Sequence, residues 1–128
     1  MLSPLRWLLF IGCCALLAYG LFRPEAPPWL FRHSDKLFHL LALAGLAISG
    51  RLAMPRLPGW LFWGGLLLLA PGLEYLQHII QPRRKFSEWD ALANLAGVLL
   101  AWIPLVLLPA LLKAWRQYRQ TRRHRINL

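Results

Sequence analysis

The sequence predicts an all-α, polytopic membrane protein, built as a bundle of four transmembrane helices. Hydrophobic residues make up 58% of the 128-residue chain, whereas an ordinary soluble domain has about 45–50%. A helix needs about 20 apolar residues to cross the hydrocarbon core of a bilayer. The apolar residues here gather in four runs, which are Trp7–Phe22, Leu37–Gly50, Leu57–Ile80 and Ala91–Leu112.

The four runs differ in length. The first is short, and the second reaches spanning length only if Ser34–Lys36 and Arg51–Met54 form its ends. Lys36 and Arg51 could extend from those ends toward water, because long cationic side chains bury their stems and expose their charged groups. The third and fourth runs are long enough to span the bilayer.

The fourth run has two further features. Ala93, Gly97 and Ala101 recur at intervals of four, and such a face of small residues is typical of close helix packing in membranes. Pro104 and Pro109 are expected to kink the inner end of the run, since proline cannot complete the helical hydrogen-bond ladder.

We expect one membrane domain over residues 1–112 and a basic cytoplasmic tail over residues 113–128. The stretch "FIGC" at 10–13 loosely resembles a lipoprotein cleavage box. However, the apolar segment between Arg6 and Cys13 is too short for a signal sequence, and apolar residues continue to Phe22. Cys13 and Cys14 are adjacent and are the only cysteines, so neither a disulfide framework nor a thiolate metal site is expected.

The distribution of cationic residues favours a cytoplasmic location for both termini. With that orientation, nine of the 15 Lys and Arg residues lie on the cytoplasmic side and six on the outer side. The positive-inside rule selects the side with more of them. The basic tail fits contact with anionic lipid, and without an aromatic stacking platform it does not indicate nucleic-acid binding.

Antiparallel connectivity brings three polar helix ends to the outer side. Polar groups within a membrane span are expected to face the bundle or a hydrated cavity. The start of the second span carries Asp35, Lys36 and His39. The end of the third carries Glu74, Gln77 and His78, and the start of the fourth carries Asp90 and Asn94.

Glu74 lies about two helical turns inside the third span, where a carboxylate has to be paired, hydrated or protonated. Arg84 is an attractive partner because guanidinium binds carboxylate through two hydrogen bonds. This pair could be structural, or it could belong to a ligand site. Ser87 is a candidate N-cap, and Asp90 three residues later completes an approximate capping box. Asp35 has the same helix-start alternative.

His39 could act as a general acid or base, or as a metal ligand. An interhelical hydrogen bond is the commoner role for a single membrane histidine. His39, His78, Glu74 and Asp90 could together imitate a metal-binding set. No HExxH or CxxC spacing is present, so we expect no metal and no cofactor.

The same residues resemble the VanZ-like family of membrane proteins. The family shows D-K-x-x-H at the start of its second span, found here at 35–39, and E-x-x-Q in its third, found here at 74–77. The family's later intervals are matched by Pro82, Arg84, Asp90, Asn94 and Gly97. The resemblance covers Asp35 to Leu108. The chain departs from it in lacking an aromatic residue near Leu43, a glycine at Ala101 and a glycine before Arg84.

The resemblance implies a role at the bacterial cell envelope. The family is named for an accessory protein of glycopeptide-antibiotic resistance, and most members have no assigned activity. The resemblance implies that the polar residues shared with the family form a site. Asp35, at the start of the second span, is added to them because it lies at the same polar helix end. The expected outer-leaflet binding site is therefore Asp35, Lys36, His39, Glu74, Gln77, Arg84, Asp90 and Asn94.

We therefore expect a multi-pass protein of the bacterial cytoplasmic membrane, and we favour a binding or accessory role over an enzymatic one, which stays open. Its expected partners are membrane lipid, an envelope polysaccharide or lipid-linked ligand, and a second membrane protein. Arg84 and Lys36 would bind an anionic head group. One alternative is a structural subunit of an envelope complex. Another is a membrane-embedded acid/base enzyme, with Glu74 or His39 as the base and Arg84 stabilising negative charge.

Overall fold

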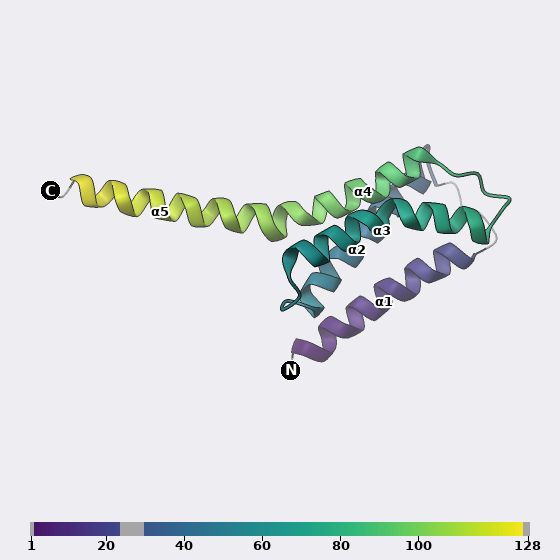
Figure 1. Ribbon diagram of the computed structural model, residues 1–128, viewed down its shortest axis with the longest axis horizontal. Coiled ribbons are helices and arrows are strands. Elements are labelled where there is room, and N and C mark those ends of the chain that lie inside the picture. Colours follow the sequence, from purple (N-terminus) through teal and green to yellow (C-terminus); the bar gives the residue numbers. More distant parts are fainter. Residues whose placement is uncertain (1, 24–29, 127–128) are drawn as a thin grey trace.

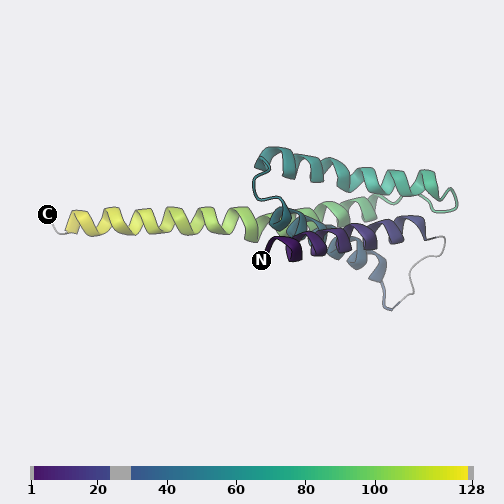
Figure 2. The same ribbon diagram turned by 90° about the horizontal axis from the view of Figure 1, so that it is seen from below.

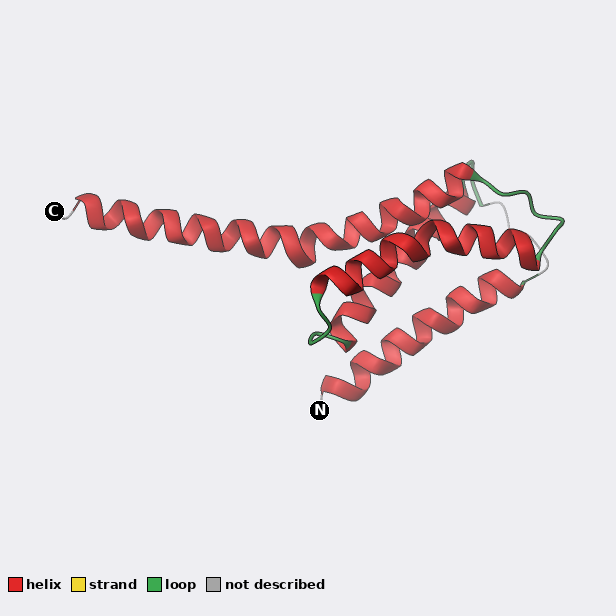
Figure 3. Cartoon of the chain, in the orientation of Figure 1, coloured by secondary structure: helices red, strands yellow, loops and turns green. Residues whose placement is uncertain are grey.

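The computed structural model describes residues 2–23 and 30–126, and throughout these ranges the regular elements are helices (Figure 3). The all-α prediction is confirmed. Residues 24–29, which form most of the expected Pro-rich first loop, lie outside the described residues. The elements are α1 (Leu2–Phe22), α2 (Ser34–Ala53), α3 (Gly59–Ile80), α4 (Glu88–Trp102), the π-helical turn η1 (Ile103–Leu107) and α5 (Leu108–Ile126).

The first four helices lie side by side, and α5 projects beyond them (Figures 1 and 2). The N-terminal end of α1, the α2–α3 connection and the start of α5 lie at one end of this bundle, and the α3–α4 connection lies at the other. Helix α2 packs most extensively against α4, α1 packs on α2, and α3 packs on α4. The polar ends of α2, α3 and α4 therefore share one end of the bundle, as the connectivity predicts.

Within residues 2–23 and 30–126, three helices are long and apolar enough to cross a membrane, namely Ser3–Phe22, Ser34–Ala53 and the continuous segment Glu88–Arg123. The second crossing includes Ser34–Lys36 and Arg51, as the length argument requires. Helix α3 is 22 residues long, but its glycines, Pro71 and Glu74 dilute its apolar content. A fourth crossing therefore stays a prediction.

Arg51, which could extend toward water from the end of the second span, is partly exposed at the end of α2. Its guanidinium Nη1 donates to the carbonyl oxygen of Leu57 at 2.7 Å and lies over the Phe62 ring, 5.6 Å from the centroid. The cation thus stabilises the turn between α2 and α3, because it satisfies a backbone acceptor and an aromatic face together.

The fourth apolar run forms one continuous helical segment that contains a π-helical turn at Ile103–Leu107. Pro104 lies in the π-helical turn, where the absent proline N–H breaks the regular ladder, and Figure 1 shows the change of direction there. The expected kink is confirmed at Pro104. The helix then continues to Ile126, so it passes through the expected boundary at residues 112 and 113 without interruption.

The core lies between α2, α3 and α4, and its most buried residues include the contact of α2 with α4. Leu43, Val98 and Ala101 are each 1% exposed. A Cβ atom added to Gly97 would fall against the carbonyl oxygen of Leu40 and 3.1 Å from the backbone nitrogen of Ala44. The small-residue face on α4 is therefore a packing surface, and Gly97 lets the two backbones meet there.

Candidate functional site

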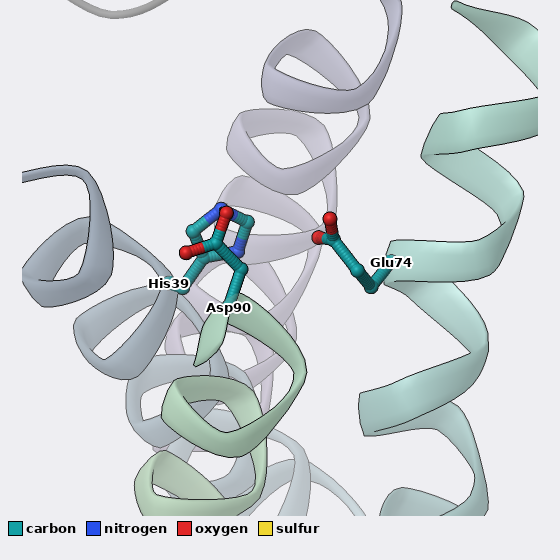
Figure 4. A group of neighbouring side chains, drawn as sticks. All are labelled: His39, Glu74 and Asp90. Atoms are coloured by element: carbon teal, nitrogen blue, oxygen red, sulfur yellow. The ribbon is translucent and has the colours of Figure 1, made fainter. Parts of the chain in front are cut away.

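The polar ends of three helices meet in one buried cluster of His39, Glu74 and Asp90, shown in Figure 4. His39 comes from α2, Glu74 from α3 and Asp90 from α4. One side-chain nitrogen or oxygen from each lies within 4.8 Å of the others. Glu74 is 5% exposed and Asp90 is 8% exposed, so both carboxyl groups are withdrawn from the surroundings of the bundle.

Asn94 fixes the orientation of the His39 ring. The Asn94 side-chain nitrogen donates to the carbonyl oxygen of Ala70 at 3.0 Å, so its side-chain oxygen is left to accept. That oxygen lies 3.1 Å from His39 Nδ1, which therefore carries the hydrogen and donates it. The interhelical hydrogen bond expected for His39 is present, and Nε2 is left as the second, variable nitrogen.

Asp90 faces two cationic or potentially cationic groups. Its Oδ2 lies 3.8 Å from His39 Nε2, and its Oδ1 lies 3.7 Å from the Lys36 ammonium. Both separations exceed hydrogen-bond length, and Oδ1 has no hydrogen-bond partner in the described part of the chain. Lys36 also lies 3.2 Å from Asp35, so two carboxylates hold this ammonium.

Glu74 accepts the hydrogen bond that completes the N-terminal cap of α4. The capping-box prediction assigned this role to Asp90. The Ser87 hydroxyl accepts the Asp90 backbone N–H at 3.2 Å, as an N-cap should. The Ser87 backbone N–H, however, donates to Glu74 Oε1 at 3.1 Å. A carboxylate from α3 thus replaces the local one, and the Asp90 side chain is released to face His39. Asp35 lies in the first turn of α2, but the N-cap there is His33.

The expected ion pair between Glu74 and Arg84 is absent among the described residues. The second oxygen of Glu74, Oε2, is buried and has no hydrogen-bond partner there. Arg84 is instead placed by its backbone, since its carbonyl oxygen accepts from His78 Nδ1 at 2.7 Å and its N–H donates to Gln81 at 2.8 Å. The α3–α4 connection therefore sets the position of Arg84 independently of Glu74.

Gln77 and Gln81 cap the end of α1. The Gln77 amide donates to the Gly20 carbonyl oxygen at 3.3 Å. The Gln81 amide donates to the carbonyl oxygen of Leu21 at 2.8 Å and to that of Arg23. The last carbonyls of a helix lack intrahelical partners, so these glutamines attach α1 to α3. Sequence reasoning missed Gln81, because no local pattern reveals a cap supplied by a distant helix.

A cavity of about 470 Å³ lies beside the cluster, between α1, α2 and α3. Its walls are mostly apolar, and six of the eight residues predicted from sequence line it. Of the other two, Asp90 lies 3.8 Å from His39, and the Lys36 ammonium lies 3.7 Å from Asp90. The cavity residues among the predicted set are Asp35, His39, Glu74, Gln77, Arg84 and Asn94.

The arrangement offers hydrogen-bond acceptors, a histidine nitrogen and cations beside an apolar space. It can hold a polar head group, exchange a proton at His39 Nε2 or coordinate a cation. No family model, no curated protein and no solved structure matches the chain. The resemblance to VanZ-like proteins therefore stays a prediction.

Proposed function

We propose that the chain is a VanZ-like, four-span protein of the bacterial cytoplasmic membrane whose outer-leaflet cavity binds an anionic amphiphile of the cell envelope. Both termini would be cytoplasmic. The observation that supports this function is the cavity itself, whose mostly apolar lining also includes polar side chains and Arg84. An amphiphile likewise combines an apolar part with a polar or charged part.

The direction of the helices supports a fourth crossing. Helices α2 and α4 run the same way through the bundle, and α3, which connects them in the sequence, runs the opposite way (Figure 1). If α2 and α4 both cross the bilayer, the chain between them has to return through the same thickness. Glu74 and Gln77 are the polar residues that this return would bury, and both already face protein partners.

The cavity walls suit a hydrocarbon chain. Leu16 and Leu17 of α1 face Phe38 of α2 and Leu73 of α3 across the space. Its volume of about 470 Å³ lies within the range of about 300–1,000 Å³ typical of small-molecule sites. Because a lipid tail gains little by moving from bilayer to apolar protein, selectivity would come from the polar head group.

Arg84 is the cation best placed for an anionic head group. It lines the cavity and, within the described part of the chain, forms no ion pair with an acidic residue. Its guanidinium can donate two parallel hydrogen bonds to a phosphate. Lys36, the other expected cation, is held by Asp35 and Asp90. We therefore assign the head group to Arg84, with Gln77 and Asn94 beside it.

A direct binding measurement tests this function. The purified full-length chain in detergent would be titrated with a polyprenyl phosphate, with phosphatidylglycerol and with neutral phosphatidylcholine, and complexes would be counted by native mass spectrometry. We expect Arg84→Gln to weaken binding of the preferred phosphate about 10–100-fold, the loss of a charge-assisted hydrogen bond. Arg83→Gln, at the exposed neighbouring residue, is the matched control. Equal binding by wild type and Arg84→Gln would refute the assignment.

The accessory role in antibiotic resistance has its own test in cells. Wild type, Glu74→Gln, Arg84→Ala and Asp90→Asn would be compared for membrane abundance and for susceptibility to a glycopeptide. We expect the variants to reach the membrane and to lose any protection that wild type confers. Variants that reach the membrane and protect as well as wild type would count against the role.

Acid/base catalysis is a second candidate, favoured by one observation. With Nδ1–H donated to Asn94, His39 keeps a nitrogen that can accept a proton, and that nitrogen faces Asp90 beside the cavity. If this reading holds, a bound polyprenyl phosphate recovered after incubation should be chemically changed by wild type and unchanged by His39→Gln. Recovery of intact ligand from wild type would oppose it.

A further inference from the structure

We propose that His39, Glu74 and Asp90 bind one divalent transition-metal ion. Metal binding at this cluster would not require the amphiphile to be bound. It concerns the interior of the cluster, where three donor side chains from three helices converge without sufficient partners of their own (Figure 4).

The spacing of the donor atoms suits a single ion. One nitrogen and two carboxylate oxygens lie within 4.8 Å of one another. Bonds from zinc to nitrogen or oxygen are about 2.0–2.2 Å long, so two ligands of one ion are separated by up to about 4 Å. A shift of under about 1 Å in side-chain position would bring the three donors to bonding distance. Carboxylate side chains can make such a shift by rotating about χ angles.

Groups around the cluster orient each ligand. His39 donates Nδ1–H to Asn94, which in turn is fixed by the carbonyl oxygen of Ala70. Metal-binding histidines almost always donate their other ring N–H in this way, which sets the tautomer and directs the free nitrogen at the ion. Glu74 is held similarly, because the Ser87 N–H binds Oε1 and leaves Oε2. His39 and Glu74 are thus both positioned by hydrogen bonds to residues outside the cluster.

Unpaired oxygens provide the second, independent observation. Glu74 Oε2 and Asp90 Oδ1 are buried without a hydrogen-bond partner in the described chain. Leaving a charged acceptor unpaired in the interior is costly. A protonated His39 would pair with Asp90 Oδ2 at 3.8 Å, but it would leave Glu74 Oε2 unpaired. A metal ion between the three side chains engages all of them.

The charged side chains of the cluster also favour a cation. Glu74 and Asp90 bring two negative charges, and Lys36, which Asp35 shares, is the one cation within ion-pair distance of either among the described residues. With neutral His39, a divalent ion would compensate this excess. One imidazole and two carboxylates with remaining open positions suit Zn²⁺ or Mn²⁺ better than Ca²⁺ or Mg²⁺, which prefer oxygen ligands alone.

A metal titration of the purified full-length chain tests the proposal without any lipid phosphate present. The protein would be treated with a chelator, its affinity tag removed, and Zn²⁺, Mn²⁺ and Mg²⁺ added separately before desalting and elemental analysis. We expect one tightly bound Zn²⁺ or Mn²⁺ per chain. Glu74→Gln, Asp90→Asn and His39→Gln should each weaken binding at least about 100-fold, and Asn94→Leu about 10–100-fold.

Two exposed residues provide matched controls. Glu88→Gln changes an acid two residues before Asp90, and His78→Gln changes a histidine four residues after Glu74. Both controls should bind the ion as wild type does. A loss of binding in the controls equal to that in the cluster variants would overturn the assignment to the cluster.

Wild type alone provides a measurement that does not depend on variants folding. Co²⁺ bound by one nitrogen and several oxygens should give visible d–d absorption that saturates at one equivalent, and Zn²⁺ should displace it. Zn²⁺ should also raise the melting temperature of wild type. If wild type gives no saturable cobalt spectrum and no thermal shift, the cluster is an ion-pair network and the proposal is wrong. Failure here leaves the amphiphile titration with Arg84→Gln unaffected.

Discussion

The backbone N–H of Ser87 donates to Glu74 Oε1 at 3.1 Å, so a carboxylate on α3 caps the first turn of α4. Asp90, which a local capping box would have used for this purpose, is thereby free to face His39. One hydrogen bond between two helices thus determines which acid stabilises the helix terminus and which belongs to the site.

Substitutions at Glu74 can separate its capping role from its charge. Glu74→Gln retains an oxygen acceptor for the Ser87 N–H, and we expect its melting temperature in detergent to stay near that of wild type. Glu74→Leu removes the acceptor and should lower the free energy of unfolding by about 1–3 kcal/mol. If the glutamine and leucine variants were equally destabilised, the hydrogen bond would not be the source of the stability.

Gly97→Ala should be strongly destabilising. Its Cβ would meet the backbone of Leu40 and Ala44, and backbone cannot move aside as a flexible side chain can. We expect a loss of at least about 1–3 kcal/mol, measured by thermal denaturation. Gly72→Ala is the matched control on α3, since nothing lies within 4 Å of an added Cβ there. It should be neutral or stabilising by about 0.5–1 kcal/mol.

The tautomer of His39 is directly measurable. In wild type, ¹⁵N spectra of labelled histidine should show a hydrogen on His39 Nδ1, because Asn94 accepts from that nitrogen. Asn94→Leu removes the acceptor, and we expect the ring to change tautomer or become mobile. The same Nδ1-protonated spectrum in Asn94→Leu would show that another group fixes the ring.

The hydrogen bonds from Gln77 and Gln81 are expected to hold the end of α1 against α3. Gln77→Met combined with Gln81→Met removes the donors to three carbonyl oxygens at the end of α1. We expect α1 to separate from the bundle more often, which would expose Cys13 and Cys14, the half-buried cysteines of this helix. A membrane-permeant maleimide should label the double variant several-fold faster than wild type. Unchanged labelling would mean that side-chain packing alone holds α1.

Reporter fusions test the orientation of the chain. With both termini cytoplasmic, a fluorescent protein fused after Leu128 should be bright, and a phosphatase inserted after Arg83 should be active on the outer side. The reverse pattern would invert the orientation and place the cavity in the inner leaflet. A phosphatase that is active both when inserted after Arg56 and when inserted after Arg83, on either side of α3, would exclude α3 as a crossing.

The helices could be predicted because their information is local. Apolar runs located all four helices of the bundle, and antiparallel connectivity brought Asp35, Glu74 and Asp90 to the same end. The small-residue face around Gly97 also identified a real contact with α2. These features depend on sequence spacing and chain direction alone.

The pairing of side chains could not be predicted in the same way. Glu74 binds the Ser87 N–H instead of Arg84, and Asp90 faces His39 instead of completing the cap of α4. Such choices depend on how far each helix is rotated about its axis and on the path of each connection. The convergence of His39, Glu74 and Asp90 is also invisible in sequence, because no spacing motif joins residues on three separate helices.

The contact at Gly97 has an evolutionary consequence. Because α2 and α4 meet there through backbone atoms, the separation of His39 from Asp90 and Asn94 is set by main-chain geometry more than by the choice of apolar side chains. Neighbouring core positions can therefore exchange one aliphatic residue for another over long divergence while the cluster keeps its shape. Descendants of this chain would be recognised by one glycine and a few polar residues, amid a core whose sequence had drifted beyond alignment.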